Sequence, residues 1–347
     1  MRAVVIREYG GLDRVMVEDL PRPAVQEAHD VVVALKAAAL NRLDLFVIGG
    51  LPGISHRFPH VIGADGAGIV ETVGSAVTRV KPGDRVMINP GLSCGACASC
   101  LAGDQSLCPS FGVLGEQVPG TFAEAVRVPE TNVAVLPADV SWSAAAAFPL
   151  ATITAWRMLA TRAAVQPAES VLIWGIGGGV ALAALASAKL LGARVIVTSS
   201  SDEKLARAKT LGADETINHA TADVAKEVRR LTARRGVNVV VDSVGEKTWE
   251  TSLRCLGRGG RLVTCGATTG PMVQTDLRKL FWHGWSILGS TMGSHAEFAR
   301  IAALFGRGAL VPVVDSVLPL ARAREAFARM EQGGQFGKLV LAIGTEE

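Results

Sequence analysis

The sequence predicts an α/β protein of two domains, in which a mostly-β domain is followed by a doubly wound parallel sheet. Three observations support this: a length of 347 residues, short apolar runs between turn residues in the first part, and alternating strand and helix patterns in the second. At roughly 150 residues per domain, the length fits two domains. Hydrophobic residues make up 49% and charged residues 19%, which excludes a disordered chain and favours a globular enzyme.

Charge is nearly balanced, because 35 basic residues stand against 32 acidic ones and leave a formal net charge of +3. Such a balance gives no electrostatic footprint for nucleic acid or for an anionic membrane, so we expect a small-molecule partner. One dense basic cluster lies in a helical stretch beside Glu227 and is interpreted as a solvated helix face without a function. It contains Arg229, Arg230, Arg234 and Arg235.

One stretch, residues 171–188, carries no charge and reaches the length of a short membrane-spanning helix. A glycine triplet at 177–179 interrupts it after an apolar run, which is typical of a strand, a tight turn and a helix inside a domain. Residues 1–10 include three charged side chains and lack the apolar segment of a signal peptide. We therefore expect a cytoplasmic protein whose cysteines are reduced.

The first part of the chain, up to about residue 135, has the spacing of an antiparallel β domain. Short apolar runs alternate there with Gly, Pro, Asn and Asp, which favour turns. These runs cover residues 3–6, 30–38, 68–73 and 85–88. An alanine-rich helical pattern at 141–164 is broken by Pro149, and we interpret it as the hinge before a second domain that begins near Pro167.

The second domain alternates strand and helix patterns, which predicts a parallel sheet covered by helices. The segments are residues 170–174, 180–191, 194–198, 202–211, 237–241, 248–256 and 261–265. Gly192 and Gly212 stand where helices end, and Ser200 with Glu203 fits a capping box at the start of the helix between them. The chain then ends in a helix at about 321–330 and a strand at 338–343.

A glycine-rich turn follows the first strand of the second domain. Backbone N–H groups of such a turn and of the next helix can hold a pyrophosphate, so we predict a dinucleotide site rather than only a tight turn. The fit to G-x-G-x-x-G is imperfect, because Val180 fills the third glycine position unless Ala181 takes that role. The residues assigned to the site are Gly175, Gly177, Gly178, Gly179 and Val180.

The second strand of this domain ends where a dinucleotide site selects between NAD and NADP. An acidic side chain there would bind the 2′-hydroxyl of NAD, but the sequence has Ser199, Ser200 and Ser201. Serine hydroxyls with Lys204 suit a 2′-phosphate, which they would bind and neutralise, so the sequence favours NADP over NAD. In the alternative interpretation, the serines only cap the helix and Asp202 only lies in its first turn.

Four of the six cysteines lie in one glycine-rich loop with the spacing of a metal site: Cys94, Cys97, Cys100 and Cys108. Four thiolates without an acidic or histidine ligand are typical of a closed, tetrahedral structural zinc. The rival is an iron–sulfur cluster, whose usual motif has three residues between the last two cysteines instead of the seven found here. Cys255 and Cys265 are interpreted as buried, inert thiols.

With these features in view, the chain resembles the medium-chain dehydrogenase/reductase superfamily, which contains zinc alcohol dehydrogenases and NADPH:quinone reductases, over nearly its whole length. The resemblance implies a GroES-like mostly-β catalytic domain at 1–150, completed by residues 290–347, and a Rossmann cofactor domain with a doubly wound parallel sheet at 151–289. Besides the cysteine loop and the glycine turn, it is carried by residues 41–44 (Asn-Arg-Leu-Asp), 63–74, 81–86, 211–214, 241–245 and 337–340.

The resemblance also reveals what this sequence lacks. Zinc alcohol dehydrogenases bind a second, catalytic zinc with cysteine and histidine side chains and a glutamate beside them. The corresponding positions here are Asn41, Ala64, Asp65 and Leu150, and the hydroxyl residue of the proton relay corresponds to Leu43. Without these ligands the site holds no Lewis acid that ionises an alcohol at neutral pH, so alcohol oxidation is not expected.

The pattern formed by Asn41, Asp44 and Asp65 is instead similar to that of zinc-free quinone and enone reductases. The resemblance implies that Asn41 donates a hydrogen bond to the developing oxyanion, that Thr154 lines the same cleft, and that water supplies the final proton. Two structural alternatives stay open. Asn41 would then only hold a turn, and Asp65 would only pair with a base such as Arg42.

Further cofactor contacts are carried over from the resemblance. Arg42 is expected to contact the pyrophosphate, Lys338 to contact the cofactor, and His219 to lie near the adenine ribose. Loops at the carboxyl ends of two further strands complete the expected site, in part next to the nicotinamide. They contain Val244, Gly266, Ala267 and Thr268.

The sequence therefore predicts an NADPH-dependent oxidoreductase that transfers hydride to a quinone, an enone or a related carbonyl compound, with one structural zinc and no catalytic zinc. Two alternatives are an NAD(P)-dependent zinc alcohol dehydrogenase and a nicotinamide-nucleotide-binding protein with little turnover. By resemblance, the strand at 285–291 lies at the sheet edge through which subunits join, which predicts a homodimer or homotetramer. The loops 49–57 and 268–281 are expected to determine which carbonyl is reduced.

Overall fold

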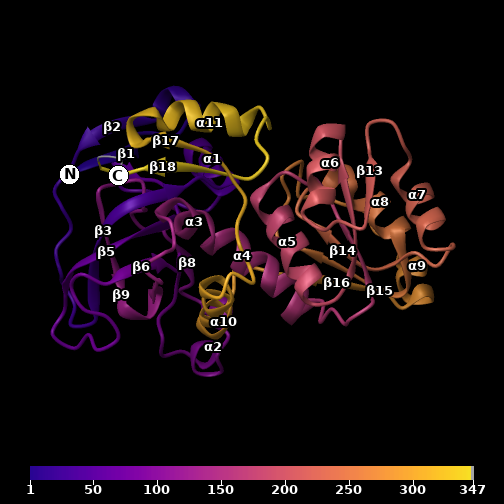
Figure 1. The fold of residues 1–347 in the computed structure, drawn as a ribbon, viewed down its shortest axis with the longest axis horizontal. Helices are drawn as coiled ribbons and strands as arrows, with labels where there is room; N and C mark the ends of the chain where they lie inside the picture. Colours follow the sequence, from indigo (N-terminus) through magenta and orange to yellow (C-terminus); the bar gives the residue numbers. More distant parts are fainter. Residues whose placement is uncertain (345–347) are drawn as a thin grey trace. The chain divides into compact units, whose positions relative to one another are not determined.

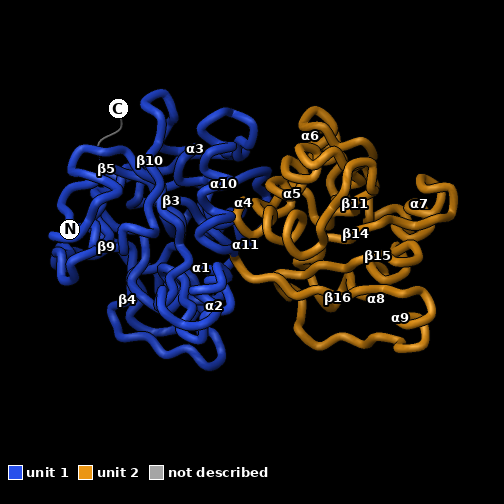
Figure 2. Tube along the Cα trace, turned by 90° about the horizontal axis from the view of Figure 1, so that it is seen from below, with its two compact units in different colours: residues 1–151, 293–347 blue, residues 152–292 orange. Residues whose placement is uncertain are grey.

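The computed structural model describes residues 1–344, and the chain divides into two compact units (Figure 2). Unit 1 consists of Met1–Ala151 and Gly293–Glu347, of which 345–347 lie outside the described residues, and unit 2 consists of Thr152–Met292. Unit 1 is mostly β, whereas unit 2 alternates strands with helices (Figure 1). The α/β fold with a mostly-β part and a parallel-sheet part is therefore confirmed.

The strands of unit 1 form three sheets. They are β1 (Arg2–Ile6), β2 (Met16–Asp19), β3 (Asp30–Ala39), β4 (His60–Val61), β5 (Asp65–Val73), β6 (Arg85–Ile88), β7 (Gly91–Leu92), β8 (Gly112–Val113), β9 (Ala125–Pro129), β10 (Val133–Val135), β17 (Val314–Pro319) and β18 (Lys338–Ala342). The largest sheet has seven strands in the order β10-β6-β5-β3-β18-β17, with β9 paired to β3. A three-stranded sheet has the order β2-β1-β4, and β7 pairs with β8.

Strand β3 lies in the middle of the large sheet, between β5 and β18, and pairs antiparallel with both. Its last residue, Ala39, is opposite Asp65 in β5 and Val340 in β18. The last strand of the chain thus pairs inside the sheet that the first part of the chain builds. Asp65 and Lys338 are the first residues of their strands, so both lie at the sheet edge where β3 ends.

The helices of unit 1 are few, and the sequence pattern did not reveal all of them. They are α1 (Arg42–Gly49), α2 (Ala98–Leu101), α3 (Trp142–Ala147), α10 (His295–Gly306) and α11 (Ala323–Glu331), with the 3-10 turns η1 (Leu12–Arg14), η2 (Gln105–Leu107), η3 (Glu130–Asn132) and η5 (Leu320–Arg322). Helix α1 was missed because a short apolar run does not distinguish a helix from a buried strand. The predicted break at Pro149 is confirmed, since α3 ends before it and α4 (Pro149–Trp156) begins with it.

Unit 2 contains one parallel sheet of six strands. The strands are β11 (Ser170–Ile173), β12 (Arg194–Ser199), β13 (Glu215–Asn218), β14 (Val237–Asp242), β15 (Leu256–Thr264) and β16 (Ser286–Gly289). Their order is β13-β12-β11-β14-β15-β16, and every neighbouring pair is parallel. The chain therefore winds outward in both directions from β11, as expected for a doubly wound sheet. Strand β13 was not predicted, because Ile217 is its only fully buried residue.

Helices connect the strands of this sheet. They are α5 (Gly179–Leu190), α6 (Asp202–Thr210), α7 (Val224–Leu231), α8 (Glu246–Cys255) and α9 (Leu277–His283), after a π-helical segment, η4 (Arg157–Arg162). Gly192 and Gly212, with φ of 80° and 98°, end α5 and α6 as predicted. The capping box at Ser200 is wrong. Because β12 extends through Ser199, the helix begins one residue later, and the Ser201 hydroxyl accepts from the Lys204 N–H at 3.3 Å.

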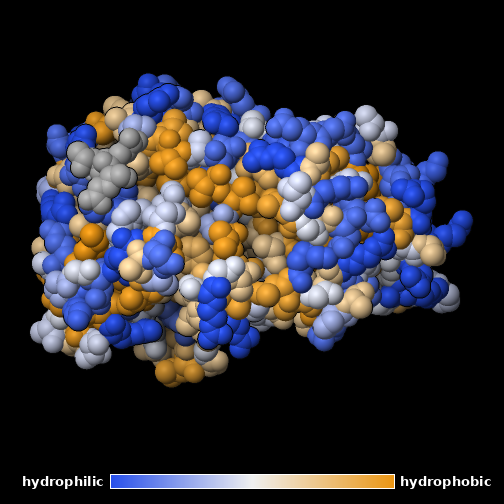
Figure 3. Space-filling view, in the orientation of Figure 1, coloured by the Kyte–Doolittle hydropathy of each residue, from blue (hydrophilic) through white to orange (hydrophobic). Residues whose placement is uncertain are grey.

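Each unit has an apolar core of its own. Phe122, Phe327 and Ile62 are among the buried residues of unit 1, and Leu172 and Val240 lie in the core of unit 2. On the face in Figure 3, apolar side chains form a broad area in the left and central part of the view, and hydrophilic side chains lie mainly around it and on the right. Among residues 1–344, no helix has both the length and the apolar character needed to cross a membrane.

Candidate active site and metal centre

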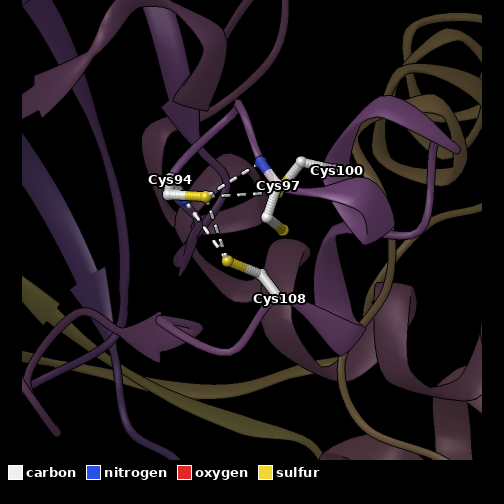
Figure 4. Close-up of side chains that lie close together, drawn as sticks. All are labelled: Cys94, Cys97, Cys100 and Cys108. Atoms are coloured by element: carbon white, nitrogen blue, oxygen red, sulfur yellow. Dashed lines mark hydrogen bonds between the residues drawn. The ribbon is translucent and has the colours of Figure 1, made fainter.

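Four cysteines of unit 1 come together in the loop that follows β7 (Figure 4). Cys94 precedes the short helix α2, Cys97 and Cys100 lie at its start and within it, and Cys108 ends the turn η2. Their four sulfur atoms all lie within 4.8 Å of one another, and all the described cysteines are free thiols. The four predicted ligands therefore form one compact cluster.

The geometry of this cluster fits one tetrahedral zinc. With Zn–S bonds of about 2.3 Å, neighbouring sulfurs would stand about 3.8 Å apart. Cys94 Sγ lies 3.5 Å from Cys108 Sγ and 4.0 Å from Cys100 Sγ. The N–H groups of Ala96 and Cys97 lower the pKa of the Cys94 thiol to about 6, which favours the thiolate that zinc binds. A space of this size suits a single ion better than a cluster of several irons and sulfides, which argues against the iron–sulfur alternative.

A second group of polar residues, here called the polar cluster, is buried where β3 ends. It consists of Asn41, Asp44, Asp65 and Lys338, whose exposed fractions are 7%, 1%, 0% and 4%. The sheet brings these residues together, because Asp65 begins β5, Lys338 begins β18, and Asn41 follows the strand between them. Residues almost 300 positions apart in the sequence therefore meet at one point.

The polar cluster is centred on the Asp65 carboxylate. Lys338 Nζ donates to Asp65 Oδ2 over 2.9 Å and also donates to Asn41 Oδ1. The Asn41 amide Nδ2 donates to the same Asp65 oxygen at 2.9 Å and, more weakly, to Ala39 O at 3.4 Å. The other carboxylate oxygen, Asp65 Oδ1, accepts from the backbone N–H of Leu150 at 2.8 Å. The ammonium thus compensates a carboxylate that burial would otherwise make very unfavourable.

A glycine two residues before Asp65 helps to position this carboxylate. Gly63 has a φ of 97°, and a Cβ on it would lie 2.1 Å from the ring of Phe122. No larger residue fits there without moving the aromatic ring. On the other side, the Thr121 hydroxyl donates to the Asp65 carbonyl oxygen at 2.7 Å. The start of β5 is therefore held by close packing and by hydrogen bonds.

The structure changes three expectations about these residues. Asp65 does pair with a base, but the base is Lys338 and not Arg42, whose guanidinium donates to the Met330 carbonyl at 3.5 Å. Asn41 does precede a helix, as the turn-holding alternative expects, yet its side chain also contacts Asp65 and Lys338. Lys338, expected as a cofactor contact, has its ammonium bonded within the polar cluster.

Burial strongly changes the acidity of the Asp44 carboxyl. Burial raises the pKa of its carboxyl to about 7, although the Asn41 N–H, donated to Asp44 Oδ2 at 2.7 Å, and the Lys338 ammonium act in the opposite direction. The carboxyl is therefore partly protonated near neutral pH. With Asp44 neutral, the cluster holds one carboxylate and one ammonium, so its buried charges balance.

This titration predicts a pH dependence of stability. The folded protein holds the Asp44 proton up to a pH of about 7, whereas the unfolded chain releases it near pH 4. Stability is therefore lost as the pH rises through that window, by on the order of 4 kcal/mol. Replacing Asp44 by Asn removes the titrating group, and the urea-unfolding free energy of D44N should change much less between pH 5 and pH 8 than that of the wild type.

Asp84→Asn is the control for this measurement, because Asp84 accepts a backbone N–H from Lys81 at 2.9 Å on the surface. The control should keep the pH dependence of the wild type. An unfolding free energy whose pH dependence is the same in D44N and in the wild type would show that Asp44 titrates in its ordinary range.

In unit 2, the glycine turn joins β11 to α5 as predicted. Gly175 and Gly177 have φ of 68° and 127°, values that favour glycine, and Gly178 precedes α5 without a side-chain cap. The first N–H groups of α5 are therefore available to an anion. Ala181 is buried and Val180 is only partly buried, so the small residue of the motif is Ala181. The predicted order of strand, glycine turn and helix is therefore present.

The residues predicted to select NADP lie at the end of β12. Ser199 is buried, and its hydroxyl accepts from the Ser201 N–H at 3.1 Å. Asp202, the first residue of α6, has its carboxylate bonded to the Asn218 amide at 2.7 Å. Asp202, the acidic residue closest in sequence to the end of β12, thus already has a hydrogen-bond partner in Asn218. Ser200 and Lys204 complete the predicted group, the first exposed and the second partly buried.

The other predicted cofactor residues of unit 2 follow the carboxyl ends of neighbouring strands. The His219 N–H donates to the Ser199 carbonyl at 3.0 Å, which holds the segments after β13 and β12 together. The Thr269 N–H donates to the Val244 carbonyl at 2.8 Å, so the loop containing Gly266, Ala267 and Thr268 is tied to the loop after β14. All these residues lie at the carboxyl ends of the parallel strands, which is where α/β proteins bind nucleotides.

The sequence analysis missed one residue that positions a loop at these carboxyl ends. Asp242, fully buried at the end of β14, accepts from the N–H groups of Val244 and Gly245 at 2.8 and 3.1 Å. Its other carboxylate oxygen accepts from the Ser252 hydroxyl at 2.7 Å, and Ser252 in turn accepts from the Trp174 indole. The sequence did contain a signal for Asp242, because a single acidic residue ends a mostly apolar run that forms a strand. Asp242 shapes the loop that carries Val244.

Thr154 lies in α4 within unit 2, where it is buried and donates its hydroxyl to Met292 Sδ at 3.8 Å. Arg42, Asn41, Asp44, Asp65 and Lys338 belong to unit 1. The predicted site residues thus divide between the polar cluster in unit 1 and the carboxyl ends of the strands in unit 2. The first has the donors and charges to bind an oxygen, and the second has the open helix N-terminus to bind phosphate.

Comparison with known families agrees with this division. An alcohol dehydrogenase GroES-like domain model matches residues 27–138, and a zinc-binding dehydrogenase model matches residues 179–307. Fold and site together define an oxidoreductase with a GroES-like part and a nucleotide-binding part. The chain belongs to the medium-chain dehydrogenase/reductase superfamily, among its zinc alcohol dehydrogenase-like members.

Several relatives align over almost the full length. A zinc-type alcohol dehydrogenase-like protein of Schizosaccharomyces pombe is 34% identical, with 99% of both chains covered. A quinone oxidoreductase of Pseudomonas aeruginosa is 33% identical, with 96% of this chain and 97% of the relative covered. A solved NAD-dependent alcohol dehydrogenase is 46% identical with a TM-score of 0.95, covering 99% of this chain and 100% of that one.

Proposed function

We propose that the protein is an NADPH-dependent reductase that transfers hydride to a quinone, an enone or a related carbonyl compound without a catalytic zinc. The observation that carries this proposal is the buried contact of Lys338 with Asp65 and Asn41. By resemblance, Asn41 and Asp65 correspond to positions that bind the catalytic zinc in alcohol dehydrogenases, whereas Lys338 corresponds to a cofactor contact. In this chain two of the ligand positions are the apolar Ala64 and Leu150, and the carboxylate is already bonded to an ammonium.

An ammonium group suits the reduction of an activated carbonyl better than the oxidation of an alcohol. A zinc ion lowers the pKa of an oxygen bound to it, whereas an ammonium neutralised by a carboxylate only donates hydrogen bonds. Hydrogen bonds are sufficient for the reduction of a conjugated carbonyl, because its carbon is already electrophilic enough to accept the hydride. The hydrogen-bond donor then stabilises the negative charge that develops on oxygen. NADPH supplies that hydride when it is bound.

Lys338 is the donor that we assign to the substrate oxygen. Its ammonium has three N–H bonds, and among the described residues only Asp65 and Asn41 accept from it. The third N–H is left for a ligand, while the amide N–H groups of Asn41 already donate to Asp65 and Ala39. Asn41 and Asp65 then act as positioning residues. Hydride on carbon and a proton from water on the enolate complete the reduction of an enone. For a quinone, one hydride from NADPH and one proton from water together give the hydroquinone.

The proposal is tested by assaying both directions of the reaction. Oxidation of NADPH should be seen with a quinone and with a simple enone, at rates that a chelator leaves unchanged. Oxidation of a primary alcohol that a chelator abolishes would instead identify a zinc alcohol dehydrogenase, the activity named for most of the relatives. Tight binding of NADPH without turnover of any of these substrates would identify a nicotinamide-nucleotide-binding protein.

The preference for NADPH rests on the residues at the end of β12. No acidic side chain follows the strand directly, and the Asp202 carboxylate is bonded to Asn218. Placing a carboxylate at position 199 should repel a 2′-phosphate and accept the 2′-hydroxyl of NADH. The variant S199D is therefore expected to shift the ratio of kcat/KM for NADPH and NADH toward NADH by at least about tenfold, or about 1.4 kcal/mol.

Ser199→Ala is the matched control for this substitution, because it removes the hydroxyl and adds no charge. It should weaken the binding of NADPH moderately and leave the KM for NADH within about twofold of the wild-type value. Equal Michaelis constants for each cofactor in S199D and in the wild type would remove Ser199 from the selector. A wild type that prefers NADH would reverse the proposed preference itself.

A structural zinc is the second part of the proposal. Four cysteine sulfurs within 4.8 Å of one another supply a full tetrahedral set, and they leave no ligand position for a substrate. The ion would hold the loop between β7 and β8 in shape without taking part in hydride transfer. We assign one zinc to each chain.

Association of identical chains is the third part. Strand β16 is at the edge of the parallel sheet in unit 2, where an uncovered row of backbone groups would promote unwanted pairing. The neighbouring helix α9 exposes three large apolar side chains, Leu277, Phe281 and Trp282, each more than 60% exposed. Apolar exposure of this kind marks a contact surface. A homodimer or homotetramer joined at this edge would cover it.

A further inference from the structure

A cavity of about 690 Å³ opens in unit 2 at the amino ends of the parallel strands. Three of its lining residues, Ser170, Arg194 and Val237, are the first residues of β11, β12 and β14. The residues expected to bind the dinucleotide follow the other ends of these strands. The cavity is therefore a different place from the expected cofactor site.

Four arginines line this cavity, and none of its described lining residues is acidic. Arg194 is paired with Glu215 at 2.9 Å, and Arg258 donates to the Trp282 carbonyl at 3.2 Å. The other two are Arg234 and Arg235. Within residues 1–344, no carboxylate pairs with either of their guanidinium groups. The cavity thus carries positive charge that the protein does not neutralise.

The arginines are held together by two loops that touch backbone to backbone. Gly236 has a φ of 78°, and a Cβ there would lie 2.5 Å from the Gly257 nitrogen. A Cβ on Gly257 would lie 2.6 Å from the Arg235 carbonyl oxygen. The Thr232 hydroxyl closes the first loop, since it accepts from the Gly236 N–H at 3.0 Å and donates to Val228 O at 2.7 Å. The close packing of the two loops therefore brings Arg235 and Arg258 to the same cavity.

The first loop also contains backbone strain. Ala233 and Arg234 both have left-handed conformations, with φ of 48° and 66°, which side-chain-bearing residues rarely adopt. Strain of this kind and a cluster of like charges each cost stability. Strained backbone conformations occur preferentially at functional sites. A bound anion would offset the repulsion among the guanidinium groups. Interpreting this arginine cluster only as a solvated helix face does not account for the cavity beside it.

We propose that this cavity binds a small molecule carrying a pyrophosphate or two neighbouring phosphate groups. One guanidinium group can donate two parallel hydrogen bonds to the oxygens of a phosphate. Several arginines around one cavity therefore suit a ligand with more than one phosphate. The volume is that of a small-molecule pocket, which ranges from about 300 to 1,000 Å³. The ligand is thus a compact molecule and not a nucleic acid strand, which would need an extended groove.

Calorimetric titration of the full chain with inorganic pyrophosphate tests this site. NADPH is kept at saturation so that the expected cofactor site is filled. The wild type should bind one pyrophosphate per chain at low ionic strength. The variant R234Q/R235Q should bind it at least about tenfold more weakly, because it loses two guanidinium groups that donate charge-assisted hydrogen bonds to phosphate oxygens. Arg258→Gln, on the other loop, should weaken it as well.

The matched control is R229Q/R230Q, which removes the same charge from the end of α7 but leaves every described lining residue of the cavity in place. Its affinity for pyrophosphate should stay within about threefold of the wild type. Equal losses in both double variants would mean a diffuse charge effect and would overturn the site. Absence of saturable binding, or an oligonucleotide that binds more tightly than pyrophosphate, would overturn it too. The readout is binding, so the result does not depend on the proposed reductase activity.

Discussion

Replacing Lys338 by methionine is expected to lower kcat for the reduction of a quinone or an enone by at least about 100-fold. Methionine keeps the length of the side chain but removes the donor assigned to the substrate oxygen, and loss of one such donor costs about 10²–10³ in kcat. The same variant leaves the Asp65 carboxylate buried without its ammonium partner. The free energy of unfolding should therefore fall by about 3–5 kcal/mol.

A double variant separates these two effects. K338M/D65N has no lone buried charge, so its unfolding free energy should return close to that of the wild type, while its kcat should stay low. If both stability and kcat return, Lys338 only balances Asp65 and is not the donor. Lys189→Met is the surface control, because Lys189 pairs with Asp214 at 2.8 Å with about a third of each side chain exposed. It should change the unfolding free energy by less than about 1 kcal/mol.

Replacing Cys100 by serine is expected to abolish zinc binding. Elemental mass spectrometry of the wild type, purified without added metal, should give one zinc per chain, and C100S should give almost none. Cys100 is buried among the other three ligands, so serine leaves three thiols around an incomplete site. Loss of a structural ion removes several kcal/mol from the stability of unit 1, which should lower Tm by about 10 °C. The kcat of molecules that remain folded should change little.

Cys255→Ser is the control for the zinc measurement, because Cys255 is buried in unit 2, outside the cysteine cluster. Cys255 is buried as predicted, and this burial raises the pKa of its thiol to about 12. This variant should keep one zinc. Two zincs per chain in the wild type would contradict a zinc-free active site and make alcohol oxidation the leading activity. Iron in place of zinc would restore the iron–sulfur alternative.

Much of the fold could be predicted because its signals are local. Apolar runs of four to six residues, such as those that became β11, β12 and β14, are buried along nearly their whole length, as parallel strands are. Helix ends at Gly192 and Gly212 follow from the left-handed conformation that glycine adopts. Elements without such a signal were missed. Strand β13 buries one residue fully, and α1 is too short for a helical period to stand out.

The candidate sites differ in the same way. The four cysteines of the compact cluster lie within 15 residues, so their spacing alone predicted that they come together, and the glycine turn was equally local. The contact of Lys338 with Asp65 spans 273 residues and depends on β18 pairing beside β3. No spacing rule predicts such a contact, and the pairing with Arg42 considered from the sequence was the local guess. The arginine cavity was missed for the same reason, since Arg194 and Arg258 join Arg234 only through the sheet.

Residue types at short separations were enough to predict the classes of element, the cysteine cluster, the glycine turn and the absence of the catalytic-zinc ligands that the resemblance names. The tertiary fold alone settles which charge lies beside Asp65. It placed the ammonium of Lys338 against Asp65 and Asn41, since the last strand of the chain pairs in the middle of the first unit's sheet. A buried carboxylate needs a counter-charge, and the fold supplies it from the far end of the chain.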